Sequence, residues 1–119
     1  MMKKLISWVE IPAENFERAT GFYAKVFNLD FQIVDCGEEK MACFPSGEGA
    51  ISYARGFKPS KDGVLVSLNT EKDLDGTIKR IQQSGGTILT PRTRIEAEGR
   101  EFFATFLDSE GNKVGLYGS

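Results

Sequence analysis

The sequence contains no histidine, a single tryptophan and only two cysteines in 119 residues. Without histidine, no imidazole is available to bind a metal ion anywhere in the chain. Two cysteine thiolates with no histidine partner also make a poor structural zinc site, because such a site normally takes four ligands. Any function must therefore be built from carboxylates, hydroxyls, cationic side chains and apolar surface.

The chain also lacks a large excess of positive or negative charge, and it lacks long apolar runs. The chain has 15 Lys and Arg against 17 Asp and Glu, a net charge of −2, which offers no bulk attraction to nucleic acid or to an anionic membrane. No apolar run approaches the roughly 20 residues that span a bilayer. Lys3 and Lys4 begin the chain as in a signal peptide, but Ser7, Glu10 and Pro12 interrupt the apolar stretch that follows. We expect a cytoplasmic protein with no nucleic-acid or membrane partner.

The two cysteines, Cys36 and Cys43, flank the segment Gly37–Ala42. If that segment is a hairpin, the two thiols could lie near one another on adjacent strands. Reduced, half-buried thiols in a reducing compartment are the favoured interpretation, and a functional pair is the alternative.

The first half of the chain has the pattern of a strand, a helix and three strands. Two sets of residues alternate, Leu5, Val9 and Ile11 with Ile6, Trp8 and Glu10, which predicts a strand. Pro12 should end this strand, and Leu5, Val9 and Ile11 should pack under a helix. Apolar residues then recur at helical spacing from Glu14-Asn15 to Phe27-Asn28, with Asn15 as the N-cap. Three short strands are predicted after it, at 31–36, 40–44 and 50–54.

The second half repeats this order, and its elements are predicted from the same kinds of signal. A strand is predicted at Val64–Leu68, followed by a helix that Thr70 caps and that has Leu74, Ile78 and Ile81 on its apolar side. A strand at Thr87–Thr90, a charged loop at Pro91–Gly99 and a hairpin of Phe102–Leu107 with Val114–Tyr117 complete the half. The repeat predicts one α+β domain of module one (1–55), a linker (56–62) and module two (63–119), whose sheets curl around a shared cleft.

Four segments of this chain resemble one family. They are Trp8–Pro12, Glu17–Phe27 with its FYAKVF ending, Gln83–Gly86 and Phe106–Asn112. The chain resembles, over nearly its whole length, the glyoxalase / bleomycin-resistance / extradiol-dioxygenase superfamily, also called vicinal oxygen chelate (VOC) proteins. The resemblance implies two βαβββ modules that form a cup-shaped mixed sheet. It also implies a homodimer, since members often dimerise and some exchange modules between chains.

Metal-dependent members of that family hold one divalent ion with histidine and glutamate side chains from four strands. Aligned on the family, those positions fall at Trp8, near Ser52, at Val64 or Val66, and at Gly115. None of these side chains supplies an anionic or imidazole donor. The resemblance therefore implies a member that needs no metal and no other cofactor, although an all-carboxylate site around Glu10 is the alternative.

The leading hypothesis is a metal-independent protein that sequesters an apolar or aromatic small molecule in the cleft between modules, as bleomycin-resistance proteins do. Trp8 either forms the bottom of the cleft, as a surface on which a ligand stacks, or fills the cleft. Glu10 would accept a hydrogen bond from the ligand. Arg94, in the charged loop, would contact an anion if that loop is a lid; otherwise the loop is simply solvated. The candidate binding residues are Trp8, Glu10, Ser52, Arg94, Phe102 and Tyr117.

Two other functions stay open. The first is an enzyme, either a lyase or isomerase related to lactoylglutathione lyase or a dioxygenase, with a non-standard site. Arginine would then replace the metal in stabilising oxyanion charge. The second is an effector-sensing module, although the chain has neither a helix-turn-helix segment nor a basic face to bind DNA itself.

Overall fold

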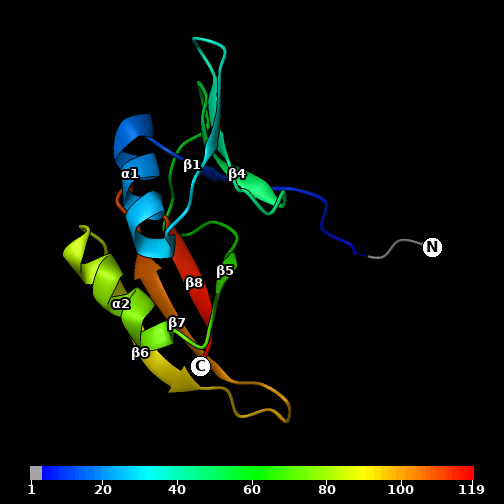
Figure 1. Ribbon diagram of the computed structural model, residues 1–119, viewed down its shortest axis with the longest axis vertical. Coiled ribbons are helices and arrows are strands. Elements are labelled where there is room, and N and C mark those ends of the chain that lie inside the picture. Colours follow the sequence, from blue (N-terminus) through cyan, green and yellow to red (C-terminus); the bar gives the residue numbers. More distant parts are fainter. Residues whose placement is uncertain (1–3) are drawn as a thin grey trace.

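Two βαβββ modules follow one another in the computed structural model, which describes residues 4–119 (Figure 1). The first contains β1 Val9–Pro12, α1 Phe16–Phe27, β2 Gln32–Asp35, β3 Lys40–Cys43 and β4 Gly49–Tyr53. The second contains β5 Ser67–Glu71, α2 Leu74–Gln83, β6 Thr87–Arg94, β7 Phe102–Leu107 and β8 Lys113–Gly118. The repeat and the α+β class predicted from the sequence are therefore confirmed.

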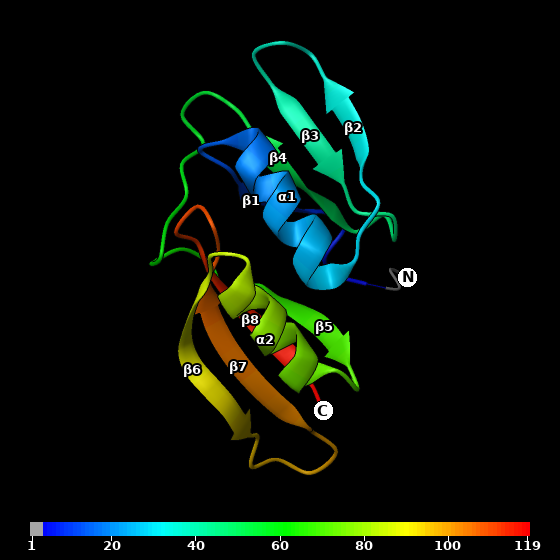
Figure 2. The same ribbon diagram turned by 60° about the vertical axis from the view of Figure 1, so that its left-hand side comes forward.

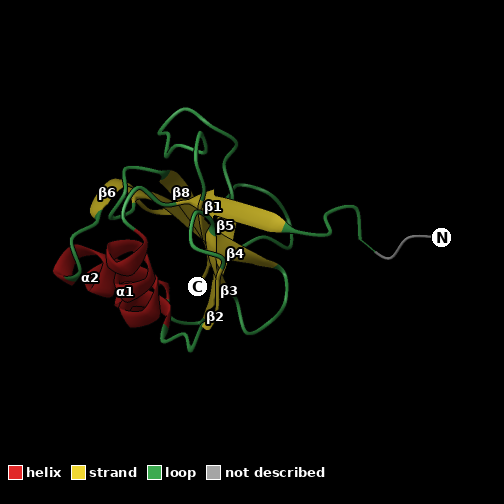
Figure 3. Cartoon of the chain, turned by 90° about the horizontal axis from the view of Figure 1, so that it is seen from above, coloured by secondary structure: helices red, strands yellow, loops and turns green. Residues whose placement is uncertain are grey.

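Each module forms its own four-stranded mixed sheet. The strand orders are β1-β4-β3-β2 and β5-β8-β7-β6, and the first and last strands of each module pair in parallel. Within residues 4–119 no strand pairing joins the two sheets, so the single cup-shaped sheet expected from the resemblance is present as two separate halves. The modules lie one above the other, with both helices on the same side of the sheets (Figures 2 and 3).

Helix α1 follows the sequence signals closely. The side chain of Asn15 accepts a hydrogen bond from the backbone N–H of Arg18 at 3.0 Å, and Asn28 ends the helix in the left-handed conformation, with φ 54°. The buried side of the helix is the predicted apolar stripe: Phe16, Ala19, Phe22, Tyr23 and Val26. None of the helices in residues 4–119 is long and apolar enough to cross a membrane.

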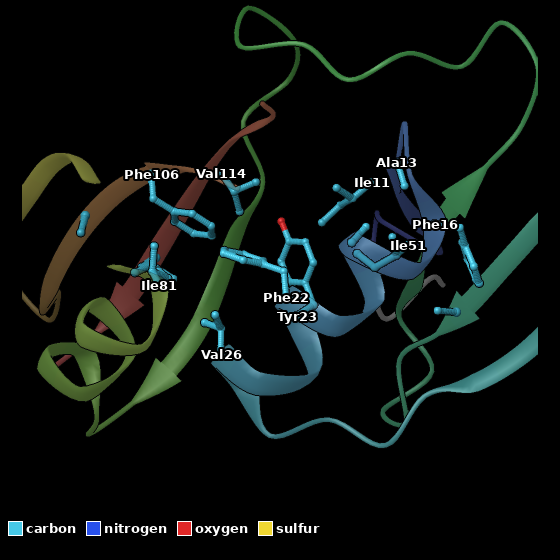
Figure 4. Packing of buried hydrophobic residues seen from close by; sticks show 14 of the residues in the cluster. Ile11, Ala13, Phe16, Phe22, Tyr23, Val26, Ile51, Ile81, Phe106 and Val114 are labelled. Carbon is cyan, nitrogen blue, oxygen red and sulfur yellow. The ribbon is translucent and has the colours of Figure 1, made fainter. Parts of the chain in front are cut away.

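One hydrophobic core runs through both modules (Figure 4). Phe22 of α1 packs against Phe106 of β7, with ring centroids 6.2 Å apart. Gly86 makes this approach possible, since a Cβ atom there would lie 2.6 Å from Ile81 and 3.0 Å from the Phe22 ring. Because apolar surface from both halves is buried in the same cluster, we expect the modules to unfold together.

The turn Asp108–Asn112 fastens module two to the start of α1. The buried Tyr23 hydroxyl donates to Asp108 Oδ2 at 2.7 Å, and Asn112 Nδ2 donates to the Pro12 carbonyl at 2.8 Å. Glu110 Oε1 accepts from the backbone N–H groups of Glu14 at 2.9 Å and Asn15 at 2.7 Å. The sequence predicted a hairpin turn here, but its turn residues also hold the two modules together.

Glu110 is buried in this contact and forms an ion pair with Arg18, whose Nε lies 2.7 Å from Oε2. Burial alone would raise the pKa of Glu110. Hydrogen bonds from the Arg18 guanidinium, the Asn15 backbone and the Ser109 hydroxyl outweigh burial, so the pKa of Glu110 is lowered. The carboxylate is therefore favoured in the folded state, where it also faces the N-terminus of α1.

Two expectations for the first module are wrong. Strand β1 begins at Val9, and Leu5 is 81% exposed instead of packed under α1. The cysteines, which could have lain near one another, lie apart: Cys43 of β3 pairs with Gln32 of β2, whereas Cys36 lies at the opposite end of the hairpin. The prediction that Pro12 ends the strand is confirmed, since β1 is Val9–Pro12.

The second module differs from the sequence prediction at three points. Strand β5 is Ser67–Glu71, three residues later than predicted. Thr70 lies within it instead of capping α2, because its hydroxyl donates to the Tyr117 carbonyl and Asp73 takes the N-cap position. Strand β6 continues through Pro91 to Arg94, since it is an edge strand with irregular register on both sides of Thr90. The charged loop is correspondingly shorter.

Replacing Tyr23 by Phe removes only the hydroxyl that donates to Asp108. Because that hydrogen bond is buried and its acceptor is charged, Tyr23→Phe should lower the free energy of unfolding by about 2 kcal/mol, measured by urea denaturation. The matched change Tyr53→Phe, at a side chain that is 38% exposed, should leave the stability unchanged. Equal stability of Tyr23→Phe and the wild type would contradict the fastening role of this contact.

Replacing Glu110 by Gln should change how stability depends on pH. A lowered pKa in the folded state stabilises the fold fully above the unfolded-state pKa of about 4.3, and this contribution is lost as the pH falls through the folded-state pKa. Chemical denaturation should find Glu110→Gln less stable than the wild type at pH 7, with the difference shrinking in acid. Glu98→Gln, in the exposed loop, is the control and should show no such difference. A gap that is constant with pH would rule out the ion pair as its cause.

Candidate functional site

A groove with a volume of about 430 Å³ lies where β1 passes the linker and the start of β8. Its walls come from both modules and are largely apolar. Three of its large hydrophobic side chains are open to solvent: Val64 is 92% exposed, Trp8 42% and Phe57 37%. Exposed apolar side chains that share one concave surface are typical of a binding site.

Three of the predicted site residues come together at this groove. Trp8, which directly precedes β1, and Glu10 within it both line the groove. The hydroxyl of Ser52, on the neighbouring strand β4, donates to Glu10 Oε1 at 2.7 Å. Ser52 is buried and does not line the groove itself, so it orients the carboxylate from the neighbouring strand.

Two lysines at the groove were not among the predicted residues. Lys113 is the first residue of β8, and its backbone N–H donates to the Ser60 carbonyl at 3.2 Å. Lys58 comes from the linker, and its Nζ lies 3.8 Å from a carboxylate oxygen of Glu14. Strand alternation could have placed Lys113 on the same face as Tyr117, but no sequence signal places Lys58.

The other three predicted residues lie elsewhere. Phe102 packs against the core, with the Arg92 guanidinium 4.0 Å from the centre of its ring. Arg94 ends β6 and is exposed beside the charged loop. Tyr117 is half-buried on the face of β8 opposite the buried Leu116, outside the groove lining. The structure thus brings Trp8, Glu10 and Ser52 together but not this second set.

The strand register shows what lies beside Gly115, the last of the positions that the resemblance assigns to a metal ligand. Its partner in β5 is Ser67, and its backbone N–H donates to the Val66 carbonyl at 2.8 Å. A Cβ atom on Gly115 would come within 2.4 Å of the Ser67 hydroxyl oxygen. On the other side Gly115 pairs with Thr105, whose buried hydroxyl has no hydrogen-bond partner in the described part of the chain. Across these three neighbouring strands, Ser67, Gly115 and Thr105 therefore present hydroxyl groups and no charged donor.

These residues do not fit the divalent ion that the resemblance implies. The positions that the resemblance assigns carry an indole, a serine hydroxyl, a valine and a glycine, and the carboxylate of Glu10 accepts a hydrogen bond from one of them, Ser52. Across residues 4–119, no three His, Cys, Asp or Glu side chains come close enough together to hold a metal ion. A divalent cation normally needs several anionic or imidazole donors, so no chemical step is assigned to one here.

Known proteins share both sequence and fold with this chain. The family model of the Glyoxalase/Bleomycin resistance protein/Dioxygenase superfamily matches residues 5–116. A "Glyoxylase-like domain-containing protein" of Didymella fabae is 32% identical over 116 residues, covering 90% of this chain and 88% of that protein.

Solved structures share the fold at lower sequence identity. A glyoxalase/bleomycin resistance protein/dioxygenase family enzyme from Burkholderia phytofirmans PsJN has a TM-score of 0.72 at 16% identity, covering 95% of this chain and 97% of that one. The fosfomycin resistance protein FosX from Mesorhizobium loti gives 0.67 at 18% identity, with coverages of 100% and 94%. A glyoxalase I mutant from Zea mays gives 0.73 at 21% identity, with coverages of 93% and 44%.

The family match over residues 5–116, the relative that is 32% identical and the paired βαβββ modules agree with one another. They confirm the superfamily predicted from the sequence motifs. This chain is a member of the Glyoxalase/Bleomycin resistance protein/Dioxygenase superfamily.

Proposed function

We propose that this protein binds an apolar or aromatic small molecule in the groove beside Trp8, without a metal ion. The observation that carries the proposal is the indole of Trp8, which lines the groove and is 42% exposed at a position where the resemblance implies a metal ligand. An indole cannot coordinate a cation, but it offers a flat surface on which another aromatic ring stacks.

The apolar walls supply the driving force for binding. Covering apolar surface releases about 25 cal/mol for each Å² removed from water, and Trp8, Val64 and Phe57 all present such surface to the groove. The carboxylate of Glu10 is fixed by Ser52 and supplies a directed polar contact. This combination of an apolar surface and a few placed polar groups is what small-molecule sites usually contain.

The enzymatic alternatives receive less support from the groove. Glyoxalase I from Zea mays and FosX share the fold of this chain at 21% and 18% identity, a likeness that does not extend to an activity. A lyase or isomerase acting here would need a group that stabilises oxyanion charge. The predicted arginine of that kind, Arg94, lies beside the charged loop and outside the groove lining. Binding without turnover is therefore the function we propose.

A neutral aromatic probe tests the binding proposal. N-phenyl-1-naphthylamine should bind, with quenching of the fluorescence of Trp8, the single tryptophan of the chain. Titration calorimetry of Trp8→Ala should show about tenfold weaker binding, because stacking contributes about 1.4 kcal/mol. Tyr53→Ala, which removes an exposed aromatic outside the groove, should bind as the wild type does. No binding, or the same loss in both variants, would contradict the proposal.

Metal independence has its own measurement. Calorimetry and native mass spectrometry with zinc, nickel, manganese and iron should detect no tight one-to-one complex, because no three His, Cys, Asp or Glu side chains in residues 4–119 come close enough together to hold an ion. A stoichiometric complex of any of these ions, abolished by Glu10→Gln, would overturn the metal-free part of the proposal. The same protein stripped with a chelator should bind the aromatic probe unchanged.

A further inference from the structure

We infer that the ligand of this groove carries charges of both signs: a planar apolar body with an ammonium group facing Glu10 and a carboxylate or similar anion facing Lys113. This inference rests on the proposed binding function and specifies its ligand class. It follows from two opposite charges that the fold places on one concave apolar surface without pairing them with each other.

The negative side of the groove is held in a defined orientation. Ser52 donates to Oε1 of Glu10 at 2.7 Å, and Ser52 itself is buried in β4. Within residues 4–119, Glu10 has no ion pair, and its Oε2 accepts no hydrogen bond. A carboxylate oriented by a neighbouring strand, with one oxygen left for another donor, is suited to an ammonium group.

The positive side comes from the other module. Lys113 begins β8, where its backbone N–H donates to the Ser60 carbonyl and the neighbouring Asn112 side chain donates to the Pro12 carbonyl of β1. These contacts join the start of β8 to the linker and to the end of β1. In the described part of the chain Lys113 forms no ion pair, and its side chain is exposed.

Lys58, the other lysine of the groove, differs from Lys113 because an acidic side chain lies beside it. Its Nζ lies 3.8 Å from the carboxylate of Glu14, so it already has a partner. Glu10 and Lys113 come from different modules, and within residues 4–119 neither forms an ion pair. Because complementary charges mainly determine which ligand is accepted, a ligand bearing both charges should be preferred over one bearing either charge alone.

Four probes with the same naphthalene ring separate the possibilities. They are 1-naphthylmethanol (neutral), 1-naphthylmethylamine (cation), 1-naphthylacetate (anion) and 1-naphthylalanine (zwitterion). Titration calorimetry at low salt should find 1-naphthylalanine the tightest, with each charged contact worth up to about fivefold in affinity. Low salt is needed because both side chains are solvent-exposed and their interactions are screened.

Two groove variants should lose one charge preference each. Glu10→Gln should bind 1-naphthylalanine no better than 1-naphthylacetate, and Lys113→Met should bind it no better than 1-naphthylmethylamine. Glu98→Gln and Lys79→Met remove the same charges from exposed positions outside the groove and should bind like the wild type. Circular dichroism would establish that all four variants are folded.

The outcomes distinguish this inference from the proposed function. If the neutral probe binds as tightly as 1-naphthylalanine, the groove binds aromatic molecules but the inference about charge is wrong. If the control variants lose affinity as the groove variants do, net charge and not the groove is responsible, and the inference is again wrong. If none of the four probes binds, the proposed function fails and the inference fails with it.

Discussion

The contact between the turn Asp108–Asn112 and the start of α1 is the interaction on which the rest of the structure depends. Asp108 accepts from the buried Tyr23 hydroxyl, Glu110 accepts from two backbone N–H groups at the helix start, and Asn112 donates to the end of β1. Since no strand pairing joins the two sheets within residues 4–119, these polar contacts and the shared core fix the position of one module against the other. Leaving such buried polar groups unpaired would cost more than each bond contributes, so the arrangement is specific.

The groove lies next to this contact between the two modules. The Asn112 side chain donates to the Pro12 carbonyl, and residues close to them along the chain, Lys113, Glu10 and Trp8, line the same groove. The hydrogen bond that joins the end of β1 to the start of β8 supports one part of the groove, and the segment between β4 and β5 supplies the rest of its lining.

The fold is the one that the superfamily shares, and the side chains of the groove are particular to this chain. Ser52, Ser67 and Gly115 provide hydroxyls and bare backbone, and Trp8 adds an aromatic surface. Such a set cannot replace the charge of a divalent ion, but it leaves apolar surface exposed and Glu10 available. Membership of the superfamily therefore indicates the architecture, while the side chains of the groove carry the argument about function.

Sequence alone determined the repeated module, helix α1 with both of its caps, the closing hairpin and the superfamily, because periodicity, turn residues and motifs are local signals. It also predicted Trp8 and Glu10 as neighbours in one site, and both line the groove. Only the tertiary structure decided that Phe102 packs against the core, that Ser67 lies beside Gly115, and that Lys58 and Lys113 reach the same groove. Strand register and the approach of distant segments depend on long-range packing, which no short stretch of sequence encodes.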